Sequence, residues 1–424
     1  MRRRQFFGTL GGSLAALEAA RAQGPGQNAL SSRQAQNYGD VSAVYPGDAE
    51  AYFTEEKLRQ AVDTSVSLKG IKFEVVTFNF PSCHPSPYME KIFGKGWTEW
   101  EILKNSKPLY PGHLFPKYPL WGYFNEAEPE WAEREIDAAA DNGIDVWMID
   151  WYWHSGTMFY HEQLEQGFLK ARNRSKLKFA IMWANHHWWN QYPANCSTPD
   201  EAAVLLPQLH GEKDMLKVID YCIEHYFHQP NYWRIDGKLV FCIIGYGLLL
   251  ETFSPAELPR VLDKMRERVA KAGLGDIHFQ TMVGYGGTKS EVKKLGFESA
   301  AHYHSFGRYH KWAEGSRTPF GAAAQIAIQN WKETLTDVTF FPDCPVGWDD
   351  SPRYGAGARM VTQRTPDQYE RLLRAAQYFS AASPAKPKII FLSAWNEWTE
   401  DHVLLPDTVF GYSYLDAVRR AFRG

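Results

Sequence analysis

Two glutamates near the C-terminus, Glu397 and Glu400, combine a residue type and a spacing that suit acid–base chemistry. Two carboxyl groups held close together do not both ionise easily, so one keeps its proton while the other carries a charge at neutral pH. This arrangement suits cleavage of an acetal, in which one group protonates the leaving oxygen and the other drives the attack. Paired acidic residues also occur in solvated loops and at helix N-termini. The flanking Trp395 and Trp398, directly after the apolar run Ile389–Ala394, favour the chemical interpretation.

The elements that must position these glutamates are short apolar runs separated mostly by amphipathic stretches. The runs are Phe73–Phe80, Ile144–Asp150, Leu177–Trp183, Leu239–Ile244, Ile277–Val283, Ser299–His304, Val338–Asp343 and Ile389–Ala394. The stretches expected to be helical include Glu130–Asn142, Pro255–Ala272, Pro319–Thr334 and Pro366–Ser380. Apolar strands that alternate with helices indicate a parallel sheet covered by helices.

Eight such runs predict an α/β fold, a (β/α)8 TIM-type barrel with long loops at the C-terminal face of the strands. We expect residues 49–424 to form this barrel as a single domain. The connection between the fifth and sixth runs leaves little room for a full helix. An open, doubly wound sheet is therefore the alternative fold.

A barrel places its chemistry just after the C-terminal ends of its strands, and polar and aromatic residues are dense at those positions. The chain contains 16 Trp, 22 Tyr and 25 Phe, and flat aromatic side chains can stack on sugar rings. The predicted substrate-binding residues are Asn79, Asp150, Trp151, Trp183, Asn185, His186, Tyr246, Tyr303, His304, Trp348, Asp349, Asn396 and Trp398.

Several of these residues have an equally ordinary structural explanation. Asp150 can cap a loop instead of binding a hydroxyl, and Asp349 can form an ion pair with Arg353 that holds its own loop. The stacking walls are expected to be Trp151, Trp183 and Trp398, although any of the three can belong to the core.

Composition excludes other classes of function. The formal net charge of −3 gives no electrostatic reason to expect a nucleic-acid partner. No run of eighteen apolar residues is present, so we expect no membrane span. The histidines form no HExxH motif or other complete ligand set, and Gly284–Ser290 lacks the spacing of a phosphate-binding loop. We therefore expect neither a metal nor another cofactor.

The N-terminal residues are typical of an export signal. Arg3-Arg4 precede a short apolar, glycine-rich stretch, and Ala20-Arg21-Ala22 supplies the small residues that a signal peptidase recognises. We expect residues 1–22 to be a twin-arginine-type signal peptide and residues 23–48, rich in Gly, Gln, Asn and Ser, to be a flexible arm or linker. The expected location is outside the cytoplasm, in the periplasm or secreted.

Several short blocks resemble the WbsX-like proteins, which are relatives of the family 99 glycoside hydrolases, the endo-α-mannanases and endomannosidases. The blocks are Ala394–Glu400, Leu404–Asp407 and Gly411–Leu415 at the C-terminus, and Pro111–His113, Pro116, Pro119, Gly122-Tyr123, Trp183–Asn185 and Gly347–Arg353 before them. They occur in order along most of residues 70–420. The resemblance implies a (β/α)8 barrel, as does the strand count.

The catalytic glutamates of family 99 lie in a Glu-Trp-His-Glu motif, and the matching segment here is Glu397-Trp398-Thr399-Glu400, with Thr in place of His. The resemblance implies that Glu397 is the base that deprotonates the sugar 2-hydroxyl and that Glu400 is the acid that protonates the leaving group. The sugar would then attack its own anomeric carbon, with retention through an anhydro-sugar.

The expected function is an exported glycoside hydrolase that cleaves α-linked, mannose-like oligosaccharides or polysaccharides. One alternative is a glycosyltransferase of polysaccharide assembly, because WbsX-like proteins have been named so. The expected export signal argues against it, since nucleotide sugars are cytoplasmic. The other alternative is a non-catalytic carbohydrate-binding barrel that has kept the two glutamates.

Overall fold

The computed structural model describes residues 49–189, 204–284, 289–306 and 317–424. The expectations for a signal peptide over residues 1–22 and a linker over residues 23–48 lie outside these residues and remain predictions. None of the described helices has the length and apolar character that a bilayer crossing requires.

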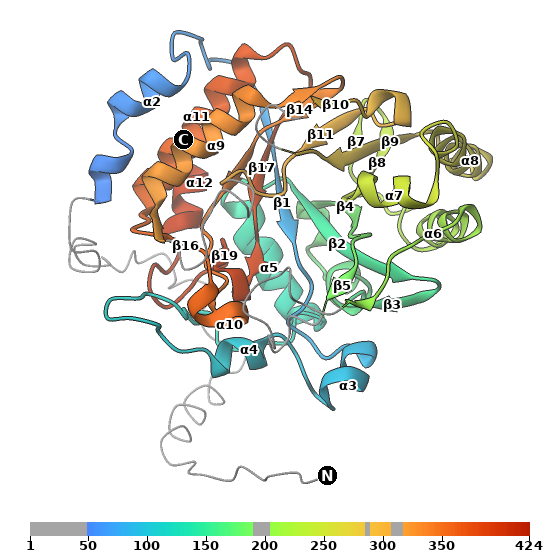
Figure 1. The fold of residues 1–424 in the computed structure, drawn as a ribbon, viewed down its shortest axis with the longest axis horizontal. Helices are drawn as coiled ribbons and strands as arrows, with labels where there is room; N and C mark the ends of the chain where they lie inside the picture. Colours follow the sequence, from blue (N-terminus) through green and yellow to red (C-terminus); the bar gives the residue numbers. More distant parts are fainter. Residues whose placement is uncertain (1–48, 190–203, 285–288, 307–316) are drawn as a thin grey trace. The chain divides into compact units, whose positions relative to one another are not determined.

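The described residues are built around a nearly closed parallel barrel (Figure 1). Its strands are β1 (Phe73–Asn79), β2 (Val146–His154), β4 (Lys178–Trp183), β8 (Lys238–Ile243), β9 (Ile277–Met282), β11 (Ser299–Ala301), β14 (Thr339–Phe341), β15 (Asp343–Pro345) and β17 (Lys388–Ser393). They follow the order β14-β11-β9-β8-β4-β2-β1-β17-β15, and each neighbouring pair is parallel. The predicted TIM-type barrel is therefore confirmed.

The seventh predicted run, Val338–Asp343, explains how the barrel nearly closes. It contains β14, which pairs with β11, and ends at Asp343, the first residue of β15, which pairs with β17. Pro342 lies between the two segments and has no N–H to donate to a ladder. Its carbonyl oxygen still accepts a hydrogen bond from the backbone N–H of Phe391 at 2.9 Å. The two ends of the strand path thus belong to consecutive segments of the chain.

Helices flank the barrel, with α6 and α8 on one side and α9, α11 and α12 on the other in Figure 1. The helices are α2 (Glu55–Ala61), α3 (Pro87–Phe93), α4 (Trp100–Asn105), α5 (Pro129–Asp141), α6 (Glu212–His225), α7 (Tyr246–Thr252), α8 (Leu258–Lys271), α9 (Phe320–Glu333), α10 (Ser351–Tyr354), α11 (Pro366–Ala382) and α12 (Ser413–Arg423). Between β9 and β11 the described helical structure is one 3-10 turn, Lys293–Leu295, as the short connection predicted.

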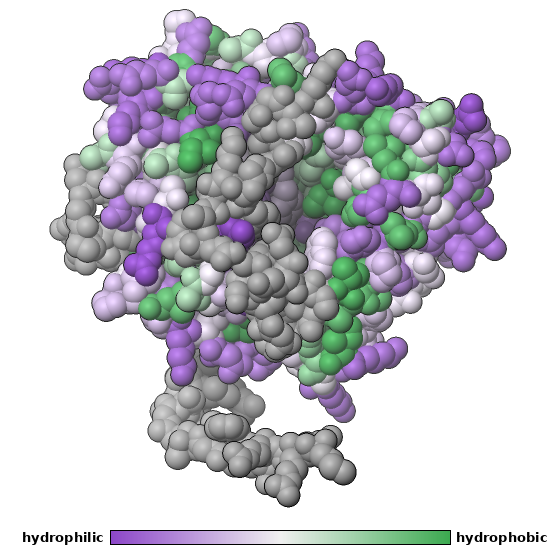
Figure 2. All heavy atoms as spheres, in the orientation of Figure 1, coloured by the Kyte–Doolittle hydropathy of each residue, from purple (hydrophilic) through white to green (hydrophobic). Residues whose placement is uncertain are grey.

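The helices form where the sequence supplies start signals and one apolar face. Helix α11 begins with Pro366, and its N-cap residue Thr365 accepts a hydrogen bond from the backbone N–H of Gln368 at 3.2 Å. Helix α8 buries Leu258, Val261, Leu262, Met265 and Val269, which follow helical spacing. The surface over α6 and α8 is mainly hydrophilic, at the right edge of Figure 2.

Short strands outside the main path pair with a barrel strand or with each other. They are β3 (Thr157–Phe159) beside β2, β7 (Arg234–Ile235) beside β8, β5 (Trp188–Trp189) with β6 (Val204–Leu206), β10 (Lys289–Ser290) with β13 (Leu335–Thr336), β12 (Arg317–Pro319) with β16 (Met360–Thr362), and β18 (Asn396–Glu397) with β19 (His402–Val403). The pair β18–β19 lies just beyond the C-terminal end of β17. It carries the segment that the sequence singles out for chemistry.

Candidate active site

The two glutamates lie beyond the C-terminal end of β17, where a barrel places its chemistry. Glu397 ends β18, and Glu400 ends a single 3-10 turn, Trp398–Glu400. Both side chains are buried, and a carboxylate oxygen of each lies within 4.8 Å of the other. The structure thus brings together the pair predicted from the sequence.

Glu397 lies in surroundings that favour its protonated form. Burial raises the pKa of Glu397 well above its usual value, and the charge of Glu400 and a hydrogen bond to it raise the pKa further. The hydroxyl of Tyr303 donates to Oε1 of Glu397 and, at 3.3 Å, to Oδ2 of Asp150. Burial and the neighbouring carboxylate therefore both favour the protonated form of Glu397.

Glu400 has a cationic partner. Nη1 of Arg353 donates to Oε1 of Glu400, and Nη2 of Arg353 donates to Oε1 of Glu99 at 3.2 Å. Nε of Arg353 donates to the hydroxyl oxygen of Thr399 at 3.0 Å, and the Thr399 hydroxyl donates to Glu99. All of these side chains are buried. This network holds a guanidinium charge against the carboxylate of Glu400.

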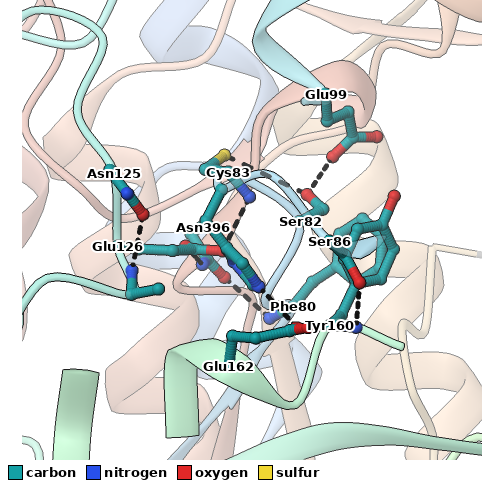
Figure 3. A network of polar contacts seen from close by, with 12 residues as sticks. Phe80, Ser82, Cys83, Ser86, Glu99, Asn125, Glu126, Tyr160, Glu162 and Asn396 are labelled. Carbon is teal, nitrogen blue, oxygen red and sulfur yellow. Dashed lines mark hydrogen bonds and ion pairs between the residues drawn. The ribbon is translucent and has the colours of Figure 1, made fainter. Parts of the chain in front are cut away.

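A second polar network fixes the start of the glutamate segment (Figure 3). Oδ1 of Asn396 accepts from the backbone N–H of Phe80 at 2.7 Å, and its Nδ2 donates to Glu126 at 3.1 Å. The other oxygen of Glu126 lies 3.2 Å from Nδ1 of His84, whose Nε2 lies 3.1 Å from Glu162. Burial lowers the pKa of His84, but its two carboxylate partners raise it above the usual value. Asn396 therefore positions the segment through its amide.

Three predicted binding residues, Asn79, Asp150 and Tyr303, lie toward or just beyond the C-terminal ends of β1, β2 and β11. Asn79 is fully buried, and neither polar atom of its side-chain amide has a hydrogen-bond partner among the described residues. Oδ1 of Asp150 is likewise buried without a partner in this part of the chain. Tyr303 contacts both Asp150 and Glu397. Since buried polar groups normally have partners, these atoms suit a ligand rich in hydroxyl groups.

His304 and Trp348 form a stacked pair beside this site. Their ring centroids are 4.4 Å apart with an interplanar angle of 28°. Burial lowers the pKa of His304 to about 4, so its imidazole is neutral at physiological pH. Both residues lie near His402, at 6.1 Å and 5.6 Å between ring centroids. Through His402, both rings lie beside the strand pair that carries Glu397.

The three tryptophans expected to stack on sugar are placed differently. Trp151 donates its indole N–H to Tyr226 at 3.1 Å, and its ring stacks on Trp153. Trp183 is fully buried and packs against His210 at 4.7 Å. Trp398 is 1% exposed and packs against the ring of Trp100. These positions fit the core alternative better than walls of a substrate groove.

The remaining predicted residues hold loops together. The amide of Asn185 donates to the carbonyl of Gly245 and accepts from its N–H, at 3.0 and 2.8 Å. His186 stacks on Trp189 at 5.6 Å, and Tyr246 begins α7 with its ring 6.4 Å from that of Phe297. His186 also lies within electrostatic range of the glutamate pair, because the charge of Glu400 opposes the burial that lowers the pKa of His186.

Asp349 and Arg353, the two residues of the possible loop ion pair, both have other partners in the structure. Oδ2 of Asp349 instead lies 2.6 Å from Nε2 of His113, while Arg353 pairs with Glu400 and Glu99. A cavity of about 350 Å³ opens beside this loop, and Asp349, His113 and Asp401 are among the residues that line it. Neither glutamate is among the residues that line this recess.

Sequence reasoning missed four residues of this site: Glu99, Glu126, Arg353 as a partner of Glu400, and His402. Glu99 and Glu126 lie in the long connection after β1, far from the glutamates in sequence, and no local pattern marks them. His402 follows the motif by two residues, so its closeness to Glu400 was the available signal. One ligand atom from each of Glu397, Glu400 and His402 lies within 4.8 Å of the others, so these three residues could hold a metal ion.

Comparisons with known proteins agree with this fold. The chain is similar to the GH99 endo-alpha-mannosidase from Bacteroides thetaiotaomicron, with a TM-score of 0.52, 15% identity, and coverage of 83% of this chain and 96% of that one. It is also similar to a solved glycoside hydrolase-like protein, with a TM-score of 0.55, 13% identity, and coverage of 87% and 99%. At these identities the likeness concerns the fold.

At the level of sequence, the chain is 26% identical over 366 residues to "Uncharacterized protein WxcX" from Xanthomonas campestris pv. campestris, covering 82% of this chain. The chain spans about half of that relative, 49% of its length. The family model described as "Glycosyltransferase WbsX" matches residues 75–418. Because that match covers most of the sequence, the chain belongs to the WbsX family.

Proposed function

We propose that the protein is a glycoside hydrolase that uses Glu397 and Glu400 as a paired acid and base. The observation that carries this proposal is the burial of the two carboxyl groups within 4.8 Å of each other, beyond the end of β17. One proton and one charge are then available at the same point, as acetal cleavage requires. The barrel fold shared with family 99 hydrolases supports the same reaction class.

The resting charges differ from those that the reaction needs. Without substrate, burial and the charge of Glu400 favour a protonated Glu397, while Arg353 faces the carboxylate of Glu400. For Glu397 to deprotonate the sugar 2-hydroxyl, its own proton must first pass to Glu400. The two groups are hydrogen-bonded neighbours, so this transfer needs no other carrier. Glu400 then protonates the leaving oxygen while the 2-oxygen attacks the anomeric carbon.

The proposed substrates are α-linked, mannose-like oligosaccharides or polysaccharides. The name of the Bacteroides relative, an endo-alpha-mannosidase, supports this class. The unpartnered polar atoms of Asn79 and Asp150 would bind hydroxyl groups, and the His304–Trp348 pair would lie against a sugar ring. We also propose that the protein acts outside the cytoplasm, on the strength of the N-terminal export pattern.

The second candidate is a glycosyltransferase, which the description of the family model favours. One experiment separates the candidates: the purified protein is incubated with α-linked oligosaccharides, with and without a nucleotide sugar. Release of reducing ends without the nucleotide sugar supports the hydrolase. Elongation that depends on the nucleotide sugar supports the transferase, and binding without turnover supports a non-catalytic barrel.

A further inference from the structure

His402 reaches the two glutamates through the turn that follows them. Strand β19 pairs antiparallel with β18, and in this register His402 lies directly opposite Glu397. Residues opposite each other in an antiparallel pair project from the same face. The turn between the strands is held at Asp401, which adopts a left-handed φ of 52° and pairs with Arg364 at 3.0 Å and Lys117 at 2.7 Å.

The imidazole of His402 is fully buried, and neither of its nitrogens has a hydrogen-bond partner among the described residues. Burial lowers the pKa of His402 well below its usual value, so the ring is neutral and offers one N–H donor and one acceptor. A nitrogen of this ring and an oxygen of each glutamate lie within 4.8 Å of one another. A single small group between them would contact all three side chains.

Thr399, which stands where the family 99 motif has a histidine, contacts a different part of the site from His402. The hydroxyl of Thr399 is bonded to Arg353 and Glu99 and therefore belongs to the network behind Glu400. The side chain of Thr399 thus helps to position Arg353, the partner of Glu400. An imidazole nevertheless reaches the glutamate pair, from three residues further along the chain.

We propose that His402 is a catalytic residue that binds the sugar hydroxyl lying between Glu397 and Glu400, the hydroxyl that attacks the anomeric carbon. This inference rests on the proposed function. The hydroxyl donates its proton to Glu397, and the N–H of His402 donates to the oxygen as negative charge develops there. The new bond from this oxygen to the anomeric carbon forms as the glycosidic bond breaks, and Glu400 gives its proton to the leaving oxygen. Water then opens the anhydro-sugar, returning a proton to Glu400 while Glu397 reprotonates the hydroxyl.

A divalent cation is the competing occupant, because two carboxylates and an imidazole are ligands that Zn²⁺ accepts. The neighbouring charges disfavour it. Arg353 already places a guanidinium on Glu400, and a second cation within a few ångströms would be repelled. The Tyr303 hydroxyl also occupies Oε1 of Glu397. A neutral hydroxyl, with one donor and two acceptor sites, fits these surroundings better.

The test compares His402→Phe and His402→Gln with the wild type on an aryl α-glycoside. The matched control is His278→Phe, because His278 is also buried but lies on β9 near its N-terminal end, where it bonds to Ser299. We expect His402→Phe to lower kcat/KM by about 10²-fold, as for the loss of one positioned donor. We expect His402→Gln to recover part of the loss, and the control to stay within about twofold. Thermal unfolding shows whether each variant is folded. If His402→Phe is unfolded, the kcat/KM of His402→Gln is used to test the inference.

Binding of non-hydrolysed ligands supplies a readout that a structural role would not change. Calorimetry compares two ligands that differ only in the 2-hydroxyl group, one that keeps it and one 2-deoxy ligand that lacks it. His402→Phe should lower the affinity for the first ligand and leave the affinity for the 2-deoxy ligand unchanged. Equal weakening of both ligands would overturn the inference. Activity lost on dialysis against a chelator and restored by Zn²⁺ would also overturn it, in favour of a metal site.

The glutamate variants keep the two proposals distinguishable. If Glu397→Gln and Glu400→Gln lose turnover of a natural α-linked glycan while both His402 variants remain near wild type, the inference about His402 fails alone. If both glutamate variants keep turnover of that glycan, the proposed function itself fails.

Discussion

Arg353 should set the pH range in which the glutamate pair works. The guanidinium pairs with Glu400, and its charge also lowers the pKa of Glu397, which burial and Glu400 raise. Two unit charges about 4 Å apart at an effective dielectric constant of about 20 interact by about 4 kcal/mol. An opposite charge at this range commonly moves a pKa by about 1–3 units. Arg353→Met should therefore shift both limbs of the pH profile of kcat/KM to higher pH by about 1–3 units.

The measurement is kcat/KM for a natural α-linked glycan, whose leaving group needs the acid, over a wide pH range, because that profile reports the ionisations of the free enzyme. The two limbs belong to the coupled pair and not to either glutamate alone. A matched control is Arg266→Met, which removes a guanidinium that pairs with Asp263 on helix α8. We expect the control to leave the profile unchanged.

Arg353→Met should also lower stability, since removing one partner of a buried ion pair typically costs about 3–5 kcal/mol. A lower melting temperature alone does not show whether Arg353 only supports the fold or also sets the ionisation of the glutamates. The shift of the pH profile distinguishes these two roles. An unshifted profile in a folded Arg353→Met variant would refute the reasoning. Arg353 would then only hold the loop against Glu99 and Thr399.

Four further outcomes follow from the structure and the sequence. Trp398→Ala should lower the free energy of unfolding by about 3–5 kcal/mol, because the ring is buried against Trp100; unchanged stability in denaturant titrations would return Trp398 to the substrate wall. Gly347→Ala should impair activity, because a Cβ at this position would lie 2.8 Å from the carbonyl oxygen of Asp401 and against Arg364, and would push the turn before His402 out of place. Wild-type kinetics would show that this turn can move without loss of activity. Burial raises the pKa of Asp350 from 3.8 to about 7, so its contribution to stability is full below about pH 4 and is lost as the pH rises through 7. Asp350→Asn should therefore reduce the fall in melting temperature between about pH 4 and 7. The same fall in the variant as in the wild type would contradict this. Replacing Arg3 and Arg4 by Lys should keep the protein in the cytoplasm, whereas cell fractionation showing normal export would count against a twin-arginine signal.

The fold could be predicted because its signals are local. Each strand of the barrel is a short apolar run, and helices such as α5 and α11 begin at Pro129 and Pro366. The division of the seventh strand could not be predicted from apolarity, since it depends on which neighbour each half pairs with. Pro342 was the one local sign of that break.

The glutamate pair could also be predicted, because its two members are neighbours in sequence after an apolar strand. Their partners could not, because Arg353 on helix α10 and Glu99, which accepts a hydrogen bond from Arg353, come from distant parts of the chain. The roles of Trp151 and Trp398 illustrate the converse problem. An aromatic residue at a strand end has the same sequence signal whether it faces a groove or packs against a helix, and only the structure shows which neighbour it contacts.

The most direct test of the paired-glutamate mechanism compares two substrates that differ in their leaving group. Glu400→Gln should lower turnover of a natural α-linked glycan by about 10²-fold or more, and should spare a nitrophenyl glycoside, whose leaving group needs no protonation. Glu397→Gln should lower turnover of both substrates, because the internal nucleophile needs its base whatever leaves. Near-normal turnover of both substrates by both variants would contradict the mechanism and place the chemistry elsewhere in the barrel.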